Sequence, residues 1–131
     1  MLTRAWLILK LKGTNKVVIL KRSKKSNNSG QWDFIGGSSR RKRINPRKLI
    51  KKESVEEIGL PLMKVTLIKI IPAKRSTYHY YVSEISRKQF NSLELNYEHS
   101  KIKLLAMNKL AKKKNKRLHH SIRIYLKNIN N

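Results

Sequence analysis

The sequence predicts a layered domain of the α/β or α+β class, in which two or more helices alternate with four to six strands. Short apolar segments bounded by turn residues recur along the chain, as is typical of strands. Between them lies one segment with clear start and stop signals of a helix. The 131 residues contain neither an internal repeat nor a linker, so we expect one domain over residues 1–131.

The chain before this helix predicts a β-hairpin and a short extended segment, separated by loops. Apolar runs on both sides of a Gly-Thr-Asn turn indicate the hairpin, and a Gly-Gly pair ends the extended segment. The loops are predicted from their polar and basic composition. In chain order we expect strands at 2–12 and 16–22, a loop at 23–30, an extended segment at 31–35 and a basic loop at 38–44.

Residues 46–58 give the clearest helix prediction. Asn45 is a good N-cap residue, and Pro46 occupies the first helical position, where its missing N–H costs nothing. Gly59 is suited to the C-terminal stop, and Pro61 cannot continue the helix. The elements expected after it are strands at 62–74 and 76–85 around a turn at 73–75, a connection at 86–100, a strand at 101–106 and helical structure from 108 onward, most clearly at 118–129.

The composition excludes several classes of protein. No cysteine is present, which rules out a disulfide-stapled secreted scaffold, a thiolate zinc site and a cysteine nucleophile. The longest apolar run, at residues 5–9, is too short to span a bilayer and does not continue into a signal peptide. We therefore expect no membrane association and a cytoplasmic location.

The charge is strongly unbalanced. The chain has 32 Lys and Arg but 7 Asp and Glu, which gives a net charge of +25. A genome rich in A and T could supply many of the lysines, because Lys, Asn and Ile together make up 47 of the 131 residues. That bias does not remove Glu, so the shortage of acids is the more informative feature. So positive a field attracts nucleotides, RNA or another polyanion.

Three of the seven acids share one face of the predicted helix. Glu53, Glu56 and Glu57 lie at i, i+3 and i+4, where like charges repel one another. A solvated acidic face, partly neutralised by Lys52, would need no ligand. Because these acids crowd onto one turn of a chain rich in lysine, we favour a site for Mg²⁺ or Mn²⁺, which bind clustered carboxylate oxygens.

The segments around this acidic face resemble the Nudix box, whose pattern is G-x5-E-x7-R-E-U-x-E-E-x-G-U, with U aliphatic. The resemblance rests on the Gly-Gly pair at 36–37 and on KESVEEIGL at 52–60. WDFIGG at 32–37 resembles the family's W-x-F-P-G-G segment, and LNYEHS at 95–100 resembles a segment that often carries a further metal-binding Glu. The resemblance implies a mixed β-sheet between helices and hydrolysis of a phosphoanhydride in a nucleoside diphosphate derivative.

The box departs from the family pattern. The segment from Gly37 to Glu53 is one residue longer than the pattern, which indicates an insertion in the basic loop. The other departures are Arg43 or Ile44 at the first Glu, Lys52 at the Arg, Ser54 at an aliphatic position and Ile35 at the Pro before Gly-Gly. These changes keep the metal ligands of the pattern but alter positions that support the loop, so activity could be reduced.

The resemblance also assigns roles to individual residues. Glu98 is the candidate extra ligand or general base, and Glu53 competes for the role of base. The ligands of Mg²⁺ or Mn²⁺ would be Gly37 (through its carbonyl), Glu53, Glu56, Glu57 and Glu98. Basic residues could bind the substrate phosphates or simply be solvated, and the candidates are Arg22, Arg40, Arg41 and Arg43.

Aromatic residues offer a second kind of contact. Tyr78 and Tyr80 alternate onto one strand face, with Tyr81 on the other, and we favour packing within the sheet over stacking on a base. Trp6 and Trp32 are expected in the core or at its rim.

Three functions follow. The leading hypothesis is a Mg²⁺-dependent Nudix hydrolase acting on a small nucleotide, as MutT-type enzymes do. A second keeps the site and makes the 5′ end of an RNA the substrate, because a mononucleotide does not need so wide a positive field. A third is a basic RNA-binding module without catalysis, suggested by the altered box.

Overall fold

The computed structural model describes residues 2–41 and 43–129. In these residues seven strands form one sheet with the order β3-β2-β1-β6-β5, in which β4 also pairs with β1 and β7 with β2. The strands are β1 (Leu2–Leu11), β2 (Lys16–Arg22), β3 (Trp32–Asp33), β4 (Ile35–Ser39), β5 (Thr66–Pro72), β6 (Ser76–Ile85) and β7 (His99–Ala106). The sheet is mixed, because β1 and β6 run parallel while the other pairs are antiparallel.

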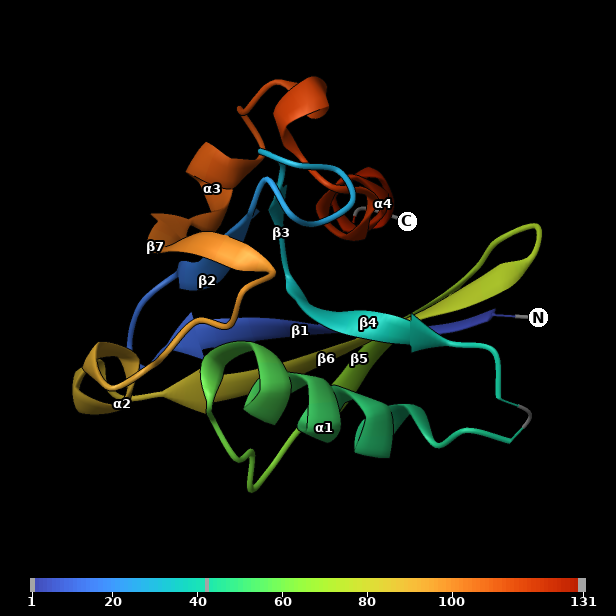
Figure 1. Ribbon diagram of the computed structural model, residues 1–131, viewed down its shortest axis with the longest axis horizontal. Helices are drawn as coiled ribbons and strands as arrows, with labels where there is room; N and C mark the ends of the chain where they lie inside the picture. Colours follow the sequence, from blue (N-terminus) through green and yellow to red (C-terminus); the bar gives the residue numbers. More distant parts are fainter. Residues whose placement is uncertain (1, 42, 130–131) are drawn as a thin grey trace.

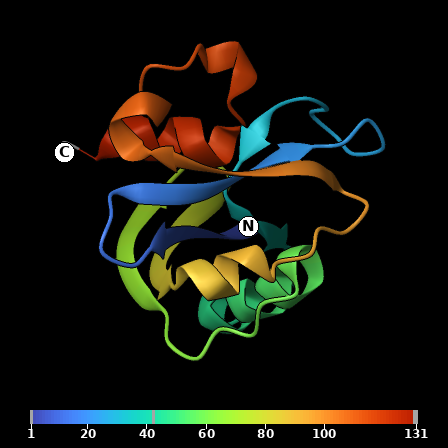
Figure 2. The same cartoon turned by 90° about the vertical axis from the view of Figure 1, so that its left-hand side faces the viewer.

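Helices cover both faces of this sheet, as predicted. In Figures 1 and 2, α1 and α2 lie on one side and α3 and α4 on the other. The helical elements are α1 (Pro46–Ile58), α2 (Arg87–Asn91), α3 (Met107–Leu110), the 3₁₀ turn η1 (Asn115–Arg117) and α4 (His120–Asn128). None of the helices in the described residues is long and apolar enough to cross a membrane.

The central strand β1 has apolar residues on both faces. Ala5, Leu7 and Leu9 belong to the core under α1, whereas Trp6 and Ile8 belong to the core under α4. Successive side chains of a strand point to opposite faces, so a strand covered on both sides is buried without a break. This burial explains the continuous apolar run that the sequence shows at residues 5–9.

Helix α1 begins and ends where its capping residues predict. The Asn45 side chain accepts hydrogen bonds from the backbone N–H groups of Arg47 (2.9 Å) and Lys48 (3.4 Å). Gly59 adopts the left-handed conformation (φ 68°), and its N–H donates to the carbonyl of Val55 at 3.0 Å. Both ends therefore rest on local signals.

The expectation of a turn and a loop after residue 35 is wrong for residues 36–39, which belong to β4. Gly36 pairs with Trp6, Gly37 with Ala5 and Ser39 with Thr3. A Gly-Gly pair is a turn signal in isolation, but here it lets the strand approach its neighbours closely. The pairing with β1 is a long-range interaction that local composition does not reveal.

Three further boundaries differ from the predictions. Strand β5 begins at Thr66 rather than residue 62, because Leu62 and Val65 pack into the core before any ladder pairing starts. The connection at 86–100 contains α2, which Ser86 and Gln89 cap reciprocally, and the last strand begins at His99. The segment after residue 108 is broken into short helical pieces, because its clustered lysines repel one another at helical spacing.

Candidate active site

Helix α1 packs on β4 and brings two of its three acids against the Gly-Gly pair. Glu57 is almost fully buried (2% exposed), and its Oε2 accepts a hydrogen bond from the backbone N–H of Gly36 at 3.2 Å. Glu53 lies against Gly37, where an added Cβ would come within 2.8 Å of its Oε1. The lack of side chains at 36 and 37 therefore lets both carboxylates reach the strand.

The two carboxylates lie close enough to each other to change their protonation. The pKa of Glu53 is raised by burial and by the charges of Glu56 and Glu98, against the opposing effects of its hydrogen bond with Glu57 and of Lys52. The pKa of Glu57 lies well above its ordinary value because of burial, and the negative charges of Asp33, Glu53 and Glu98 raise it further. This pair thus holds more negative charge than its surroundings neutralise, and it binds a proton in place of a cation.

Glu56 does not join this pair. Its side chain is half exposed, and Oε1 lies 3.7 Å from Nζ of Lys52. Within residues 2–41 and 43–129, no three His, Cys, Asp or Glu side chains converge closely enough to hold a metal ion as they stand. Of the predicted ligands, the structure therefore brings together Glu53, Glu57 and the backbone of Gly37, and leaves Glu56 outside.

Glu98 reaches the site through the segment that precedes β7. Asn96 donates its backbone N–H to the carbonyl of Glu57 at 3.3 Å, and Glu94 donates to that of Ile58 at 3.1 Å. These two bonds attach the segment to the C-terminal end of α1, where carbonyls lack partners within the helix. The charge of Glu98 consequently acts on both Glu53 and Glu57.

A buried ionic chain next to Glu57 was not predicted from the sequence. Asp33, on β3, accepts from Nη1 of Arg22 at 2.8 Å through Oδ2, and its Oδ1 lies 3.0 Å from Nε2 of His99. The other ring nitrogen of His99, Nδ1, lies 4.0 Å from Oε1 of Glu57. The alternation of β3, with Trp32 and Phe34 in one core and Ile35 in the other, was the available sign that Asp33 points toward α1.

The predicted phosphate-binding residues fall into two groups. Arg22 already has protein partners, because its guanidinium contacts Asp33 and the carbonyl of Asn27. Arg41 and Arg43, in contrast, line a cleft of about 400 Å³ between the end of β4 and α1, which also includes Glu53. Lys48 and Lys52 line the same cleft and were not among the predicted phosphate ligands, and Arg40 is exposed outside its lining.

Ser54, at a position where the family pattern has an aliphatic residue, has a structural role. It is fully buried, and its Oγ donates to the carbonyl of Leu60 at 2.8 Å. This bond satisfies a buried acceptor just beyond the end of α1. The hydroxyl is thus compatible with the core despite the departure from the pattern.

The aromatic residues pack within the sheet, as favoured from the sequence. Tyr78 and Tyr80 are buried and stack on each other, with ring centroids 6.3 Å apart. Tyr81 is buried in the opposite core, Trp6 is buried and Trp32 is partly exposed. Their surfaces are occupied by protein contacts.

Comparison with known proteins identifies relatives of this arrangement. The NUDIX domain profile matches residues 1–126, whereas no curated protein matches the sequence. The MutT protein of Methanosarcina mazei Go1 is 17% identical, with a TM-score of 0.70 over 96% of this chain and 90% of that chain. A MutT NUDIX hydrolase of Burkholderia pseudomallei is 18% identical, with a TM-score of 0.68 over 97% and 98%. The NUDIX domain of Shewanella oneidensis NrtR, solved with ADP ribose, is 13% identical, with a TM-score of 0.68 over 96% and 82%.

Proposed function

The chain belongs to the Nudix family, and on this premise we propose that it is a Mg²⁺-dependent hydrolase that cleaves a phosphoanhydride bond in a nucleoside diphosphate or triphosphate derivative. The observation that carries the proposal is the close, buried pair Glu53 and Glu57, which borders a cleft lined by cationic side chains. Such a cleft suits an anionic chain of phosphates, and the paired carboxylates suit a divalent cation at one end of it.

The donor set fits Mg²⁺ or Mn²⁺. The raised pKa values of Glu53 and Glu57 indicate carboxylate charge without a sufficient counterion, and oxygen donors are what these ions prefer. Glu53 and Glu57 would hold the ion with help from Glu98 and the carbonyl of Gly37, and Glu56 would join after leaving Lys52. When bound, the ion lowers the pKa of a coordinated water and neutralises charge on the phosphoryl oxygens.

The chain's own residues would carry the remaining chemistry. Glu53 or Glu98 accepts the proton of the attacking water as its oxygen bonds to phosphorus and the anhydride P–O bond breaks. A raised carboxyl pKa brings Glu53 nearer to the neutral range in which a general base is most effective. Arg41, Arg43 and Lys48 bind the phosphate oxygens in the cleft.

The test is phosphate release from nucleoside triphosphates, dinucleoside polyphosphates and ADP-ribose, with and without Mg²⁺. Glu57→Gln should abolish metal-dependent turnover while the protein stays folded. Glu84→Gln is the matched control, because Glu84 is exposed and does not contribute to the pKa of either site carboxyl. A folded wild-type protein that releases no phosphate from any substrate would refute the proposal.

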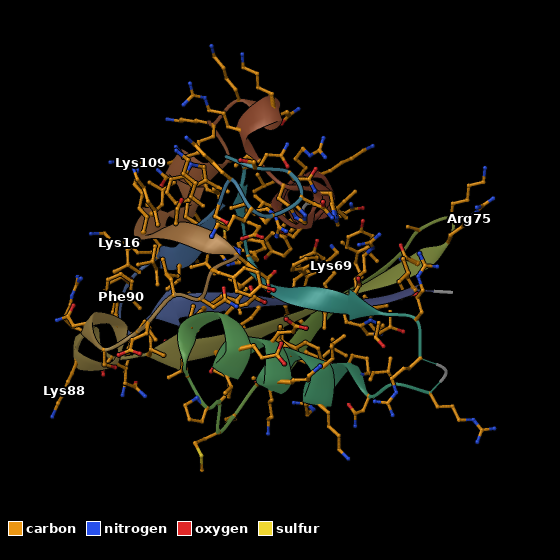
Figure 3. The ribbon with its side chains drawn as sticks, in the orientation of Figure 1. Lys16, Lys69, Arg75, Lys88, Phe90 and Lys109 are labelled. Carbon is orange, nitrogen blue, oxygen red and sulfur yellow. The ribbon has the colours of Figure 1, made fainter. Side chains whose placement is uncertain are left out.

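A triphosphorylated RNA end is the second candidate substrate, favoured by the distribution of charge. From His99 to the last residue the sequence has ten Lys and Arg and no Asp or Glu. This part forms β7, α3, η1 and α4, and the side chains of Lys16 and Lys109 extend outward in Figure 3. Nζ of Lys103 lies 5.9 Å from the ring of Trp32, which places a partly exposed aromatic ring beside the cations.

Salt dependence distinguishes the two substrates. An RNA substrate should be hydrolysed with a KM that rises steeply with salt, because its binding displaces many counterions. Equal turnover of free triphosphate and of triphosphorylated RNA, independent of salt, would argue against RNA. Tight RNA binding without turnover would instead support the non-catalytic module. A cytoplasmic location and a single domain over residues 1–131 remain predictions that fit each of these functions.

A further inference from the structure

We propose that Arg22, Asp33 and His99 form a positioning chain that holds the Glu57 carboxylate in place for the divalent cation. This inference rests on the proposed function, since it concerns the ligand Glu57. It adds to that function a residue, His99, which is expected to touch neither the cation nor the substrate. His99 would act through Glu57 and would therefore be a positioning residue.

The orientation of the His99 ring follows from Asp33. Both oxygens of this buried carboxylate are in use: Oδ2 accepts from Nη1 of Arg22 at 2.8 Å, and Oδ1 lies 3.0 Å from Nε2 of His99. Arg22 and an ionised carboxylate leave one arrangement for the third partner, in which Nε2 of His99 carries the hydrogen and donates it. The ring is thus fixed by a charge-assisted hydrogen bond at one of its two nitrogens.

The other ring nitrogen then points at Glu57. Nδ1 of His99 is buried, has no hydrogen-bond partner among the described residues and lies 4.0 Å from Oε1 of Glu57. A buried polar atom without a partner is costly, and here it faces the one carboxylate that the site would use. A movement of about 1 Å would bring the two atoms within hydrogen-bond distance.

Glu57 is consequently bracketed from two sides. The backbone N–H of Gly36 donates to its Oε2 at 3.2 Å, and the His99 ring stands against its Oε1. The nearest cation on α1, Lys52, pairs with Glu56 instead. Lateral support for the Glu57 side chain therefore comes from β3 and β7, through Asp33 and His99, and not from its own helix.

The experiment measures Mn²⁺ binding to the nucleotide-free protein, which does not depend on turnover. His99→Gln should weaken Mn²⁺ binding about 10-fold to 100-fold, the usual effect of removing an outer partner of a metal ligand. Asp33→Asn, which keeps the shape of the side chain but removes its charge, should weaken binding in the same direction. Because the two act in series, the double variant should be little worse than the weaker single variant.

Steady-state kinetics separate positioning from a general loss of structure. In His99→Gln, the apparent KM for Mg²⁺ should rise by the same factor as the Mn²⁺ dissociation constant, while kcat at saturating Mg²⁺ stays within about threefold of wild type. His79→Gln is the matched control, because His79 lies on β6 outside the chain described above. Melting temperatures report whether each variant is folded, and Asp33→Asn serves if His99→Gln is not.

Two results would overturn the inference. If folded His99→Gln and Asp33→Asn both bind Mn²⁺ within twofold of wild type, the chain does not position Glu57, although hydrolysis by the wild-type protein would leave the proposed function intact. If the wild-type protein itself neither binds Mn²⁺ nor hydrolyses nucleotides, the proposed function fails and the positioning chain fails with it.

Discussion

A single methyl group at Gly37 probes the contact between β4 and the carboxylate pair. In Gly37→Ala, the new Cβ would lie 2.8 Å from Oε1 and 2.9 Å from Cδ of Glu53. Carbon and oxygen atoms in contact usually lie about 3.3 Å apart or more, so the carboxylate would have to move by roughly 0.5 Å. The backbone should tolerate alanine, because Gly37 is not among the residues with positive φ.

The expected cost falls on the chemistry more than on stability. Overpacking usually costs about 1–3 kcal/mol, and here the smaller value is expected because the displaced group is the end of a flexible side chain. Misplacement of a reacting group by a fraction of an ångström to about 1 Å can lower the rate roughly 100-fold. We therefore expect kcat/KM to fall about 10-fold to 100-fold, with a small decrease in melting temperature.

The assay is Mg²⁺-dependent phosphate release from the best substrate, measured together with thermal unfolding. Gly13→Ala is the control, because Gly13 has a φ of 78° and open space around the added Cβ. That substitution should cost about 1 kcal/mol of stability through backbone strain and leave kcat/KM unchanged. Wild-type kcat/KM in Gly37→Ala would refute the assignment of Glu53 and Gly37 to the site.

Three further predictions use other parts of the structure. In a chelator, the free energy of unfolding of the wild-type protein should fall relative to Glu57→Gln as the pH rises from about 5 to about 8, because folded Glu57, with its raised pKa, keeps a proton that the unfolded chain has lost; urea titrations showing a difference independent of pH would contradict this. Arg41→Ala should raise KM and leave kcat within about threefold, since Arg41 lines the cleft and contacts no other site residue in the items of the reaction that we describe; a fall in kcat at constant KM would contradict it. Asn45→Ala should lower the free energy of unfolding by about 1 kcal/mol through loss of the N-cap, with kcat unchanged, as urea denaturation and kinetics would show.

The parts of the fold that were predictable from sequence are those set by local signals. The Nudix resemblance, the mixed sheet between helices and the family-level assignment as a hydrolase are confirmed. Helix α1 follows from Asn45, Pro46 and Gly59, which act within one turn of the helix ends. The capping box of Ser86 and Gln89 was an equally local signal for α2, and it was missed.

What the sequence did not reveal depends on long-range contacts. The Gly-Gly segment is a strand because it pairs with β1, some thirty residues away in the chain. Asp33 and His99 meet only because β2 pairs with both β3 and β7, which brings residues 66 positions apart into contact. The predicted ligand set stays a prediction, with Glu56 held by Lys52 in the structure and Arg22 held by Asp33.

The most direct test of the central claim compares phosphate release by the wild-type protein and by Glu57→Gln, in Mg²⁺ and in chelator. If the buried carboxylate pair is the catalytic metal site, the wild-type protein releases phosphate only in Mg²⁺, and the variant, although folded, releases none. Turnover by Glu57→Gln at the wild-type rate, or turnover in chelator, would contradict the account.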